Sequence, residues 1–285
     1  MSKPRKTANP ELFFVDPEHR PAFDKLGLTS VDAVFSFDAG VNLSKNNLAE
    51  FRTRLRFEID SPRTVLFLKR YDRPPVSAQI KNWLAHRAMV SCSSAESTPI
   101  RELTAADIRT PKIVSYGEQW GLLFERRSFV VTEKIADAES LERKIPACFT
   151  RPAIAASLKL RRDFILRLAS FVRQFHATGY RHRDLYFSHI FHDGADKFYL
   201  IDLARAFKPA ILRERFRVKD IAQLHYSAPA NYFSRTDRLR FYKKYADSAK
   251  LSDKDKAFIR RVTRKARRIR RHDSKRNRTK IRMSG

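Results

Sequence analysis

Two aspartates occur in a local context that suits chemistry on a phosphate group. Asp184 follows His182 and Arg183, directly after an amphipathic stretch that stops at Gly179, and Asp202 follows a short apolar run 18 positions later. Two carboxylates on adjacent loops can orient an acceptor hydroxyl and hold a divalent cation side by side. Phosphoryl transfer needs this positioning and charge neutralisation more than it needs covalent help from the protein. The spacing therefore predicts a phosphotransferase site.

The order of helix, His-Arg-Asp loop, short strand and Asp loop is the layout of a kinase catalytic loop followed by its metal-binding loop. We expect Asp184 to accept the proton of the acceptor hydroxyl, and Asp202 to hold Mg²⁺ on the phosphates of ATP. His182 is expected to brace the loop by hydrogen bonding. Arg205, shortly after the second aspartate, would contact either the acceptor or a neighbouring loop.

Residues upstream complete the predicted nucleotide site. Lys69 ends a predicted strand and corresponds to the strand lysine that grips the α and β phosphates in a kinase. Glu96, on the helical segment that follows, is expected to fix this lysine, with Glu102 on the same segment as the alternative partner. The backbone from Glu133 to Ile135 is expected to hold adenine. The predicted cofactors are ATP and Mg²⁺.

Periodicity predicts strands in the N-terminal half and helices in the C-terminal half. Aromatic and β-branched residues at period two predict strands at 35–37, 48–59, 65–68, 113–116, 121–124 and 128–132. Spacings of three and four predict helices over 78–107, with a serine-rich interruption at 91–94, and over 158–176, 220–247 and 258–269. The predicted fold class is α+β, a two-lobed protein-kinase-like fold with a small antiparallel-sheet N-lobe and a mainly helical C-lobe.

The 285 residues suffice for two lobes with ATP between them. The predicted organisation is a loosely structured N-terminal segment at 1–30, an N-lobe at 31–134, a C-lobe at 135–255 and a basic C-terminal helix or tail at 256–285. A content of 42% hydrophobic and 12% aromatic residues indicates a globular chain and excludes global disorder.

Cysteine usage and hydropathy exclude further classes of protein. The two cysteines, Cys92 and Cys148, are too few for a disulfide framework and have neither a metal-type nor a redox-type spacing. No segment reads as a secretory signal or approaches the ~20 apolar residues of a membrane span. We therefore expect a cytoplasmic protein whose membrane contact, if any, is peripheral.

The net charge of +28 favours polyanionic partners. Residues 260–282 alone hold 13 Lys or Arg and a single acid, Asp273. This tail has three interpretations: a solvated helix, an element that binds an anionic membrane surface, or a nucleic-acid contact. Nucleic acid is the least favoured of the three, because the tail has few aromatic residues to stack on bases.

Several stretches together resemble the Kdo/WaaP lipopolysaccharide kinase family, from about Val31 to Lys208. They are residues 68–71, 108–118, 128–133, His182-Arg183-Asp184-Leu185-Tyr186-Phe187-Ser188-His189 and Leu200-Ile201-Asp202-Leu203-Ala204-Arg205. The resemblance implies a protein-kinase-like fold, the use of ATP and Mg²⁺, and phosphorylation of heptose or Kdo in a lipopolysaccharide core or other glycolipid. It also places the activity at the cytoplasmic face of the inner membrane.

The same resemblance bears on the metal site. Members of the family commonly carry histidine where protein kinases carry the second metal-binding asparagine, which implies that His189 joins Asp202 as a metal ligand. From the residues alone, a structural histidine beneath the loop stays an alternative. The chain departs from protein kinases at three further places. No Gly-x-Gly-x-x-Gly precedes Lys69, where the nearest glycine is Gly40, and Tyr186 stands where they carry a phosphate-neutralising lysine. No glycine follows Asp202 in the sequence Asp202-Leu203-Ala204.

Two other functions remain open at the level of sequence. One is an atypical protein kinase similar to the small kinases of tRNA-modification complexes, against which His189 argues. The other is a non-catalytic pseudokinase that serves as a binding module, against which the retained pair Asp184 and Asp202 argues. A protein acceptor labelled in preference to glycolipid would favour the first, and failure to bind Mg-ATP would favour the second.

Overall fold

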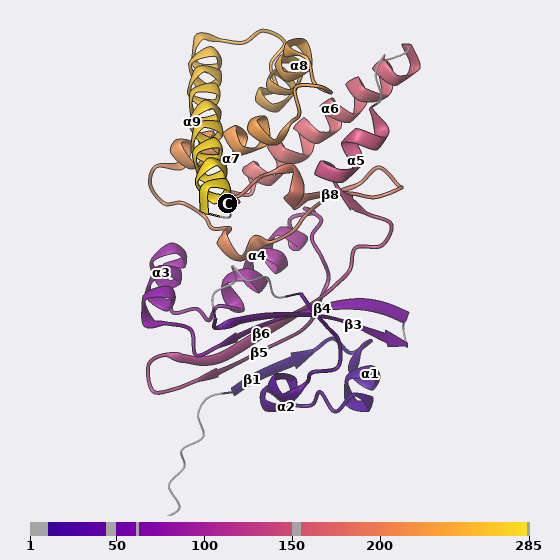
Figure 1. Cartoon of the computed structure of the whole chain (residues 1–285), viewed down its shortest axis with the longest axis vertical. Helices are drawn as coiled ribbons and strands as arrows, with labels where there is room; N and C mark the ends of the chain where they lie inside the picture. The colour runs from indigo at the N-terminus through magenta and orange to yellow at the C-terminus, as the bar shows by residue number, and fades with distance from the viewer. Residues whose placement is uncertain (1–10, 44–49, 61–62, 150–154, 284–285) are drawn as a thin grey trace, which may run out of the picture. The chain divides into compact units, whose positions relative to one another are not determined.

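The computed structural model describes residues 11–43, 50–60, 63–149 and 155–283. The chain divides into two compact units, Met1–Ala105 with Thr110–Ala136, and Ala106–Arg109 with Asp137–Gly285. The start of the predicted N-terminal segment, part of the predicted strand at 48–59 and the last residues of the tail lie outside the described residues. Figure 1 shows that the first unit is built around a sheet and that the second is mostly helical.

The first unit contains a six-stranded sheet in which every neighbouring pair is antiparallel. In spatial order its strands are β1 (Glu11–Val15), β5 (Ile113–Trp120), β6 (Glu125–Glu133), β4 (Arg63–Asp72), β3 (Arg52–Asp60) and β2 (Val41–Asn42). Strand β4 pairs with β3 on one side and with β6 on the other, so Lys69 lies in the interior of the sheet. The predicted antiparallel sheet is confirmed.

Alternation along β4 places Leu66 and Leu68 on one face of the sheet and Lys69 on the opposite face. Leu66 and Leu68 are buried in a core with Phe23, Val31 and other residues of the helices α1 (Arg20–Lys25) and α2 (Val31–Ser36). Lys69 has the opposite orientation because it is the next residue along the strand. It reaches α4 (Ser94–Ala105), which follows α3 (Val76–His86). The two helices confirm the prediction of a helical segment interrupted near 91–94.

The structure differs from the sequence prediction near the N-terminus. Residues from Glu11 on were expected to be loose, but β1 pairs with β5 along its whole length and Phe23 of α1 is fully buried. Phe35 was assigned to a strand but belongs to α2, whose N-cap Ser30 accepts a hydrogen bond from the backbone of Ala33 at 3.1 Å. The period-two spacing of Phe35 and Phe37 is typical of a strand, whereas the N-cap Ser30 and the three-residue spacing of Val31 and Val34 are typical of a helix. The helix forms because it buries both valines and satisfies the backbone at its N-terminus.

A second correction concerns residues 121–124, which were assigned to a strand. They form the turn between β5 and β6, closed by a hydrogen bond from Gly121 N–H to the carbonyl of Phe124 at 2.8 Å. The apolar run Leu122-Leu123-Phe124 resembles a short buried strand, and only its environment distinguishes the two cases.

The second unit is mainly helical, with α5 (Leu141–Cys148), α6 (Ala155–Ala177), α7 (Arg213–Ser227), α8 (Arg235–Ala246) and α9 (Asp253–Met283). A small antiparallel sheet has the order β7 (Glu139–Ser140), β8 (Ile190–His192) and β9 (Phe198–Leu200). The β8–β9 register brings the ends of the predicted catalytic loop and the predicted metal-binding loop together, since Ile190 lies opposite Leu200. The loops continue into the 3-10 turns η1 (Phe187–His189) and η2 (Leu203–Arg205).

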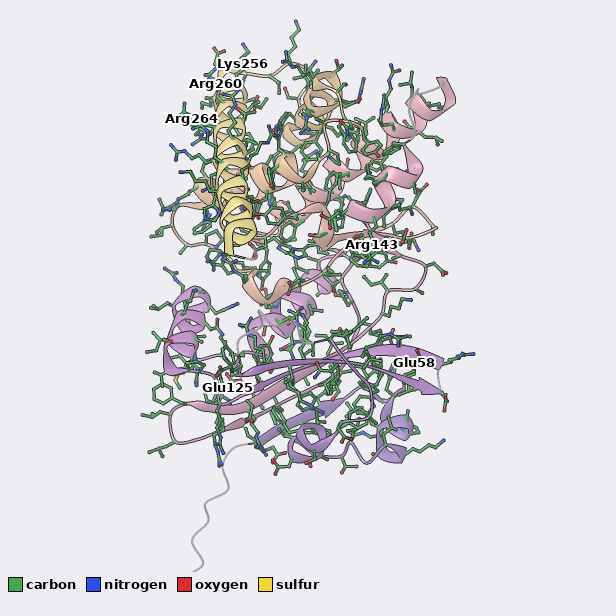
Figure 2. All side chains as sticks on the ribbon, viewed as in Figure 1. Glu58, Glu125, Arg143, Lys256, Arg260 and Arg264 are labelled. Carbon is green, nitrogen blue, oxygen red and sulfur yellow. The ribbon has the colours of Figure 1, made fainter. Side chains whose placement is uncertain are left out.

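The basic C-terminal helix α9 packs on its own unit. Its apolar residues Phe258, Val262 and Ala266 are buried, and the guanidinium of Arg217 on α7 lies 4.4 Å from the ring centroid of Phe258. Figure 2 labels Lys256, Arg260 and Arg264 along the helix, and all three are exposed. Among the described residues, no helix combines the length and apolar character needed to span a membrane.

Candidate functional site

Lys69 and Glu96 form an ion pair within the first unit. The distance from Lys69 Nζ to Glu96 Oε1 is 2.5 Å, and Glu96 Oε2 accepts a hydrogen bond from the hydroxyl of Tyr71 at 3.3 Å. Glu96 lies in the first turn of α4, where the positive end of the helix favours a carboxylate. It is buried, whereas Glu102 is exposed on the same helix. Of the two acids considered, Glu96 is therefore the one that holds the lysine.

The proposed adenine-binding segment follows the end of β6. The backbone N–H of Glu133 donates to Lys112 O at 2.9 Å, and that of Lys134 donates to Val65 O at 2.8 Å, so strand pairing uses both donors. Among the described residues, no backbone carbonyl accepts the N–H of Ile135. The Glu133 carboxylate lies 2.9 Å from the ring of the buried His19. Binding of adenine by Glu133 and Ile135 stays a prediction.

The His-Arg-Asp loop is anchored by a buried aspartate on α7. Asp220 is fully buried, and its carboxylate accepts the backbone N–H groups of His182 and Arg183, each at 2.8 Å. The third partner is His176 Nε2, at 3.3 Å from Asp220 Oδ2. Arg183 has a φ of 69°, a left-handed conformation that non-glycine residues adopt at a cost. The two hydrogen bonds to Asp220 hold the backbone in this conformation.

Burial keeps the histidines around this anchor neutral. Desolvation lowers the pKa of His176 and of His182 below the ordinary value of 6.5, although Asp220 opposes both shifts. Neutral His182 donates through Nε2 to the carbonyl of Ile201 at 3.0 Å, directly before the metal-loop aspartate. The histidine thus ties the two loops together, which is the bracing contact expected of it.

Asp184 lies among cations and amides at the surface of the second unit. Its Oδ2 accepts from Arg205 Nη1 at 2.7 Å, and its Oδ1 accepts from Gln223 Nε2 at 3.4 Å. Lys219 Nζ lies 3.9 Å from Oδ1 and donates to the carbonyl of Arg183. Burial lowers the pKa of Lys219 below 10.5, with Asp184 opposing the shift. Two positive charges therefore flank the carboxylate.

His189 lies between the two aspartates in a defined tautomer. Its Nδ1 is 2.7 Å from the backbone carbonyl of Asp184, which can only accept, so Nδ1 carries the proton. In the neutral ring Nε2 then has a free lone pair, and this atom lies 3.8 Å from Asp202 Oδ2. That separation is too long for a hydrogen bond and suits two ligands of one cation.

The donor set fits a hard divalent cation shared with phosphates. Mg²⁺ is commonly held by one or two carboxylates plus the phosphates of the substrate, and Asp202 supplies such a carboxylate. The carboxylate is partly exposed, and the residue has a φ of 57° and a ψ of 56° at the start of η2. Imidazole is a softer ligand that suits transition metals, so His189 would be the less usual Mg²⁺ ligand of the pair.

Sequence reasoning did not identify the α7 residues that surround the loop. Lys219, Asp220 and Gln223 lie on the side of the helix that contacts residues 182–185, and Gln223 Oε1 also accepts the N–H of Leu185 at 3.2 Å. The available signal was an acid beside the apolar residues Ile221 and Ala222, in a helix whose only other acid is Glu214 in its first turn. Such a residue is buried only when it is paired.

A model of the lipopolysaccharide kinase (Kdo/WaaP) family matches residues 47–245. The chain is 30% identical over 203 residues to the lipopolysaccharide core heptose(I) kinase WaaP of Escherichia coli (strain K12), a match that covers 69% of this chain and 75% of that protein. It is 33% identical over 203 residues to the protein of the same name from Pseudomonas aeruginosa (strain PAO1), with 69% and 74% covered.

A solved structure of WaaP in complex with acyl carrier protein has the same fold. The TM-score is 0.69 at 25% sequence identity, and the match covers 90% of this chain and 98% of that one. Because the match spans both units, the predicted α+β kinase-like fold class is confirmed.

Proposed function

Because the chain belongs to the lipopolysaccharide kinase (Kdo/WaaP) family, we propose that it transfers the γ-phosphate of ATP to a sugar hydroxyl of a lipopolysaccharide inner core. It is a kinase with an alcohol group as acceptor. The relatives are named heptose(I) kinases, which favours heptose over Kdo as the acceptor sugar.

The environment of Asp184 carries the proposal. Its carboxylate is held by groups from η2 and α7, so it can receive a proton without moving the loop. As the sugar oxygen bonds to the γ-phosphorus, the bond from that phosphorus to the β–γ bridging oxygen breaks. The hydroxyl proton passes to Asp184, and ADP leaves.

Positive charge beside Asp184 would stabilise the transferred phosphoryl group. Tyr186 stands where protein kinases carry a lysine, but Lys219 and Arg205 bring two cations to the same carboxylate from other elements. Fixed cations at developing charge are a principal source of catalysis in phosphoryl transfer. We assign to this pair the role of the missing loop lysine.

The remaining residues would hold the nucleotide. Asp202 and His189 Nε2 would bind Mg²⁺, which neutralises charge on the phosphates when it is bound. Lys69, fixed by Glu96 at 2.5 Å, would contact the α and β phosphates. The N–H of Ile135 and the carbonyl of Glu133 would bind the adenine edge.

The experiment follows labelled γ-phosphate from Mg-ATP into purified dephosphorylated lipopolysaccharide core. We expect the wild-type chain to label the core, and Asp184→Asn to lose about 10²–10⁴-fold in rate because the proton acceptor is gone. Asp196→Asn is the matched control, since Asp196 is an exposed aspartate of the same unit that pairs with Arg167. Undiminished transfer by Asp184→Asn would refute the role of Asp184.

The same assay separates the alternatives. If the chain fails to label a core that lacks heptose, or one that lacks Kdo, the missing sugar is the acceptor. Label in protein instead of glycolipid would favour a protein kinase. Absence of Mg-ATP binding would favour a pseudokinase. Because the WaaP structure contains acyl carrier protein, we also propose to test binding of that carrier to this chain by titration.

A lipid-linked acceptor places the reaction at a membrane surface, and ATP places it on the cytoplasmic side. The exposed basic side of α9, with Lys256, Arg260 and Arg264, could contact anionic lipid. Its apolar stripe is buried within the second unit and does not serve for insertion. Membrane and nucleic-acid contacts of this helix stay predictions.

A further inference from the structure

The first unit exposes a cluster of large apolar side chains that its fold does not use. Leu122 and Leu123 form the tip of the β5–β6 hairpin and are 98% and 61% exposed, and Leu84 on α3 is 76% exposed. Ile80 on α3 and Met89 just after it are exposed as well. We call these five residues, together with Trp83 and Phe124, the hairpin patch.

The hairpin does not require leucine at its tip. Gly121 N–H donates to the carbonyl of Phe124, so Leu122 and Leu123 occupy the two central positions of the turn. Those positions are usually filled by Gly, Asn, Asp, Ser or Pro for reasons of backbone geometry. Leu122 buries almost none of its surface in the folded chain, and Leu123 leaves more than half of its surface exposed. We therefore look for an apolar contact partner of these two leucines outside the folded chain.

Contacts between the hairpin and α3 make the patch one surface. The ring of Trp83 stacks on that of Phe124, with centroids 5.6 Å apart and an interplanar angle of 5°. The side chain of Gln79 accepts the N–H of Glu125 at 2.8 Å and donates to its carbonyl at 3.2 Å. Figure 2 labels Glu125 at the end of the sheet beneath α3. The hairpin tip and the helix are thus fixed to each other.

Most exposed charges on the two segments that form the patch are positive, and the acids Glu11 and Asp32 lie near Arg73, Arg126 and Arg127 on the same unit. In residues 72–90 and 119–127 the acids are Asp72, which pairs with Arg127, and Glu125, which is buried and accepts the N–H of Cys92 at 2.8 Å. The exposed cations of these segments are Arg73, Lys81, Arg87 and Arg126. Arg73 N–H donates to the carbonyl of Arg126 at 2.7 Å, so these two lie side by side.

We propose that the hairpin patch docks this kinase on an anionic lipid bilayer. Leu122, Leu123 and Leu84 enter the headgroup and upper acyl region, and the surrounding Arg and Lys residues contact anionic headgroups. Both tryptophans of the chain, Trp83 on α3 and Trp120 at the end of β5, occur here, and tryptophan is enriched at membrane interfaces.

The shape of the patch favours a bilayer over a protein partner. A turn whose leucine is almost completely exposed projects from the surface, whereas a partner helix or peptide docks in a groove. An apolar tip with the exposed cations Lys81, Arg87 and Arg126 on the segments that form the patch also matches the chemistry of an anionic bilayer. The inference rests on the proposed function in one respect, because a lipid-linked acceptor requires the kinase to work at a membrane surface.

The test measures binding of the full chain to vesicles of phosphatidylcholine with and without phosphatidylglycerol. We expect binding that requires phosphatidylglycerol, weakens with added salt, and brings the tryptophans within reach of quenching by brominated lipids. Leu122→Ser with Leu123→Ser should weaken binding by about 10–100-fold, the loss expected when the two changes together remove the burial of about one leucine side chain. The matched control is Leu160→Ser with Leu239→Ser, two exposed leucines of the second unit.

Several outcomes would overturn the proposal: no binding by the wild-type chain, equal binding by the Leu122/Leu123 double variant, or unquenched tryptophans on bound vesicles. Self-association that the double variant abolishes, without vesicle binding, would assign the patch to a second copy instead. Phosphate transfer to a delipidated core oligosaccharide separates docking from catalysis. The double variant should keep that activity and lose transfer to vesicle-embedded acceptor, whereas failure of both activities in wild-type protein would refute the proposed function.

Discussion

Replacing Asp220 with asparagine tests whether α7 positions the catalytic loop. The buried carboxylate accepts two backbone N–H groups at 2.8 Å, from His182 and Arg183, and a third bond from His176. Asparagine keeps one acceptor oxygen and turns an N–H₂ group toward the other donors. At least one charge-assisted bond is lost and one buried donor is left without an acceptor.

The magnitude follows from those contacts. A hydrogen bond to a charged group contributes about 1.5–3 kcal/mol, and a buried unsatisfied donor costs about 1–3 kcal/mol. We expect Asp220→Asn to lose about 2.5–6 kcal/mol of unfolding free energy in the second unit. A displacement of about 1 Å in the loop that carries Asp184 should lower kcat by about 10²-fold.

The assay combines kcat at saturating substrate with hydrogen exchange of the loop amides at 182–185. Asp237→Asn is the matched control, because Asp237 is another buried aspartate with two bonds to Ser234, in the capping box of α8. The control should lose stability but keep the kcat of the folded protein. Wild-type kcat and unchanged amide exchange in Asp220→Asn would refute the positioning role.

Three further predictions concern single groups. Glu96→Gln should lower kcat/KM for ATP by about 10–100-fold because the lysine loses its ionic partner, whereas Glu102→Gln on the same helix should leave it unchanged. Lys219→Met should lower kcat by about 10–10³-fold with little change in KM for ATP, and a larger effect of Lys208→Met would contradict the assignment. Burial lowers the pKa of His225 from 6.5 to about 4, so the unfolded chain binds a proton that the folded chain refuses. The unfolding free energy should therefore fall as the pH drops from 6.5 toward 4. Denaturant titrations at several pH values should show that the unfolding free energy of His225→Gln falls less steeply with decreasing pH than that of the wild-type chain.

Much of the fold was predictable because the relevant patterns are local. Alternation along β3 and β4, the spacing of apolar residues on α6 and the serine-rich break before α4 each show in a short window of sequence. The errors lie where a short window fits two structures. The Phe35–Phe37 spacing fits a strand, and Leu122-Leu123-Phe124 fits a buried strand, yet one lies in a helix and the other in an exposed turn.

The sequence by itself determined the family, and it predicts Asp184, Asp202 and Lys69 as the reacting groups because they occur in loops and a strand whose order is typical of a kinase. The tertiary structure decided which side chains act on them. Glu96 prevails over Glu102 because α4 turns only one of them toward β4. The β8–β9 register sets the distance between His189 and Asp202, and α7 supplies the anchor of the loop from more than 30 residues away in sequence. Such pairings depend on how distant elements dock, and no local periodicity encodes that docking.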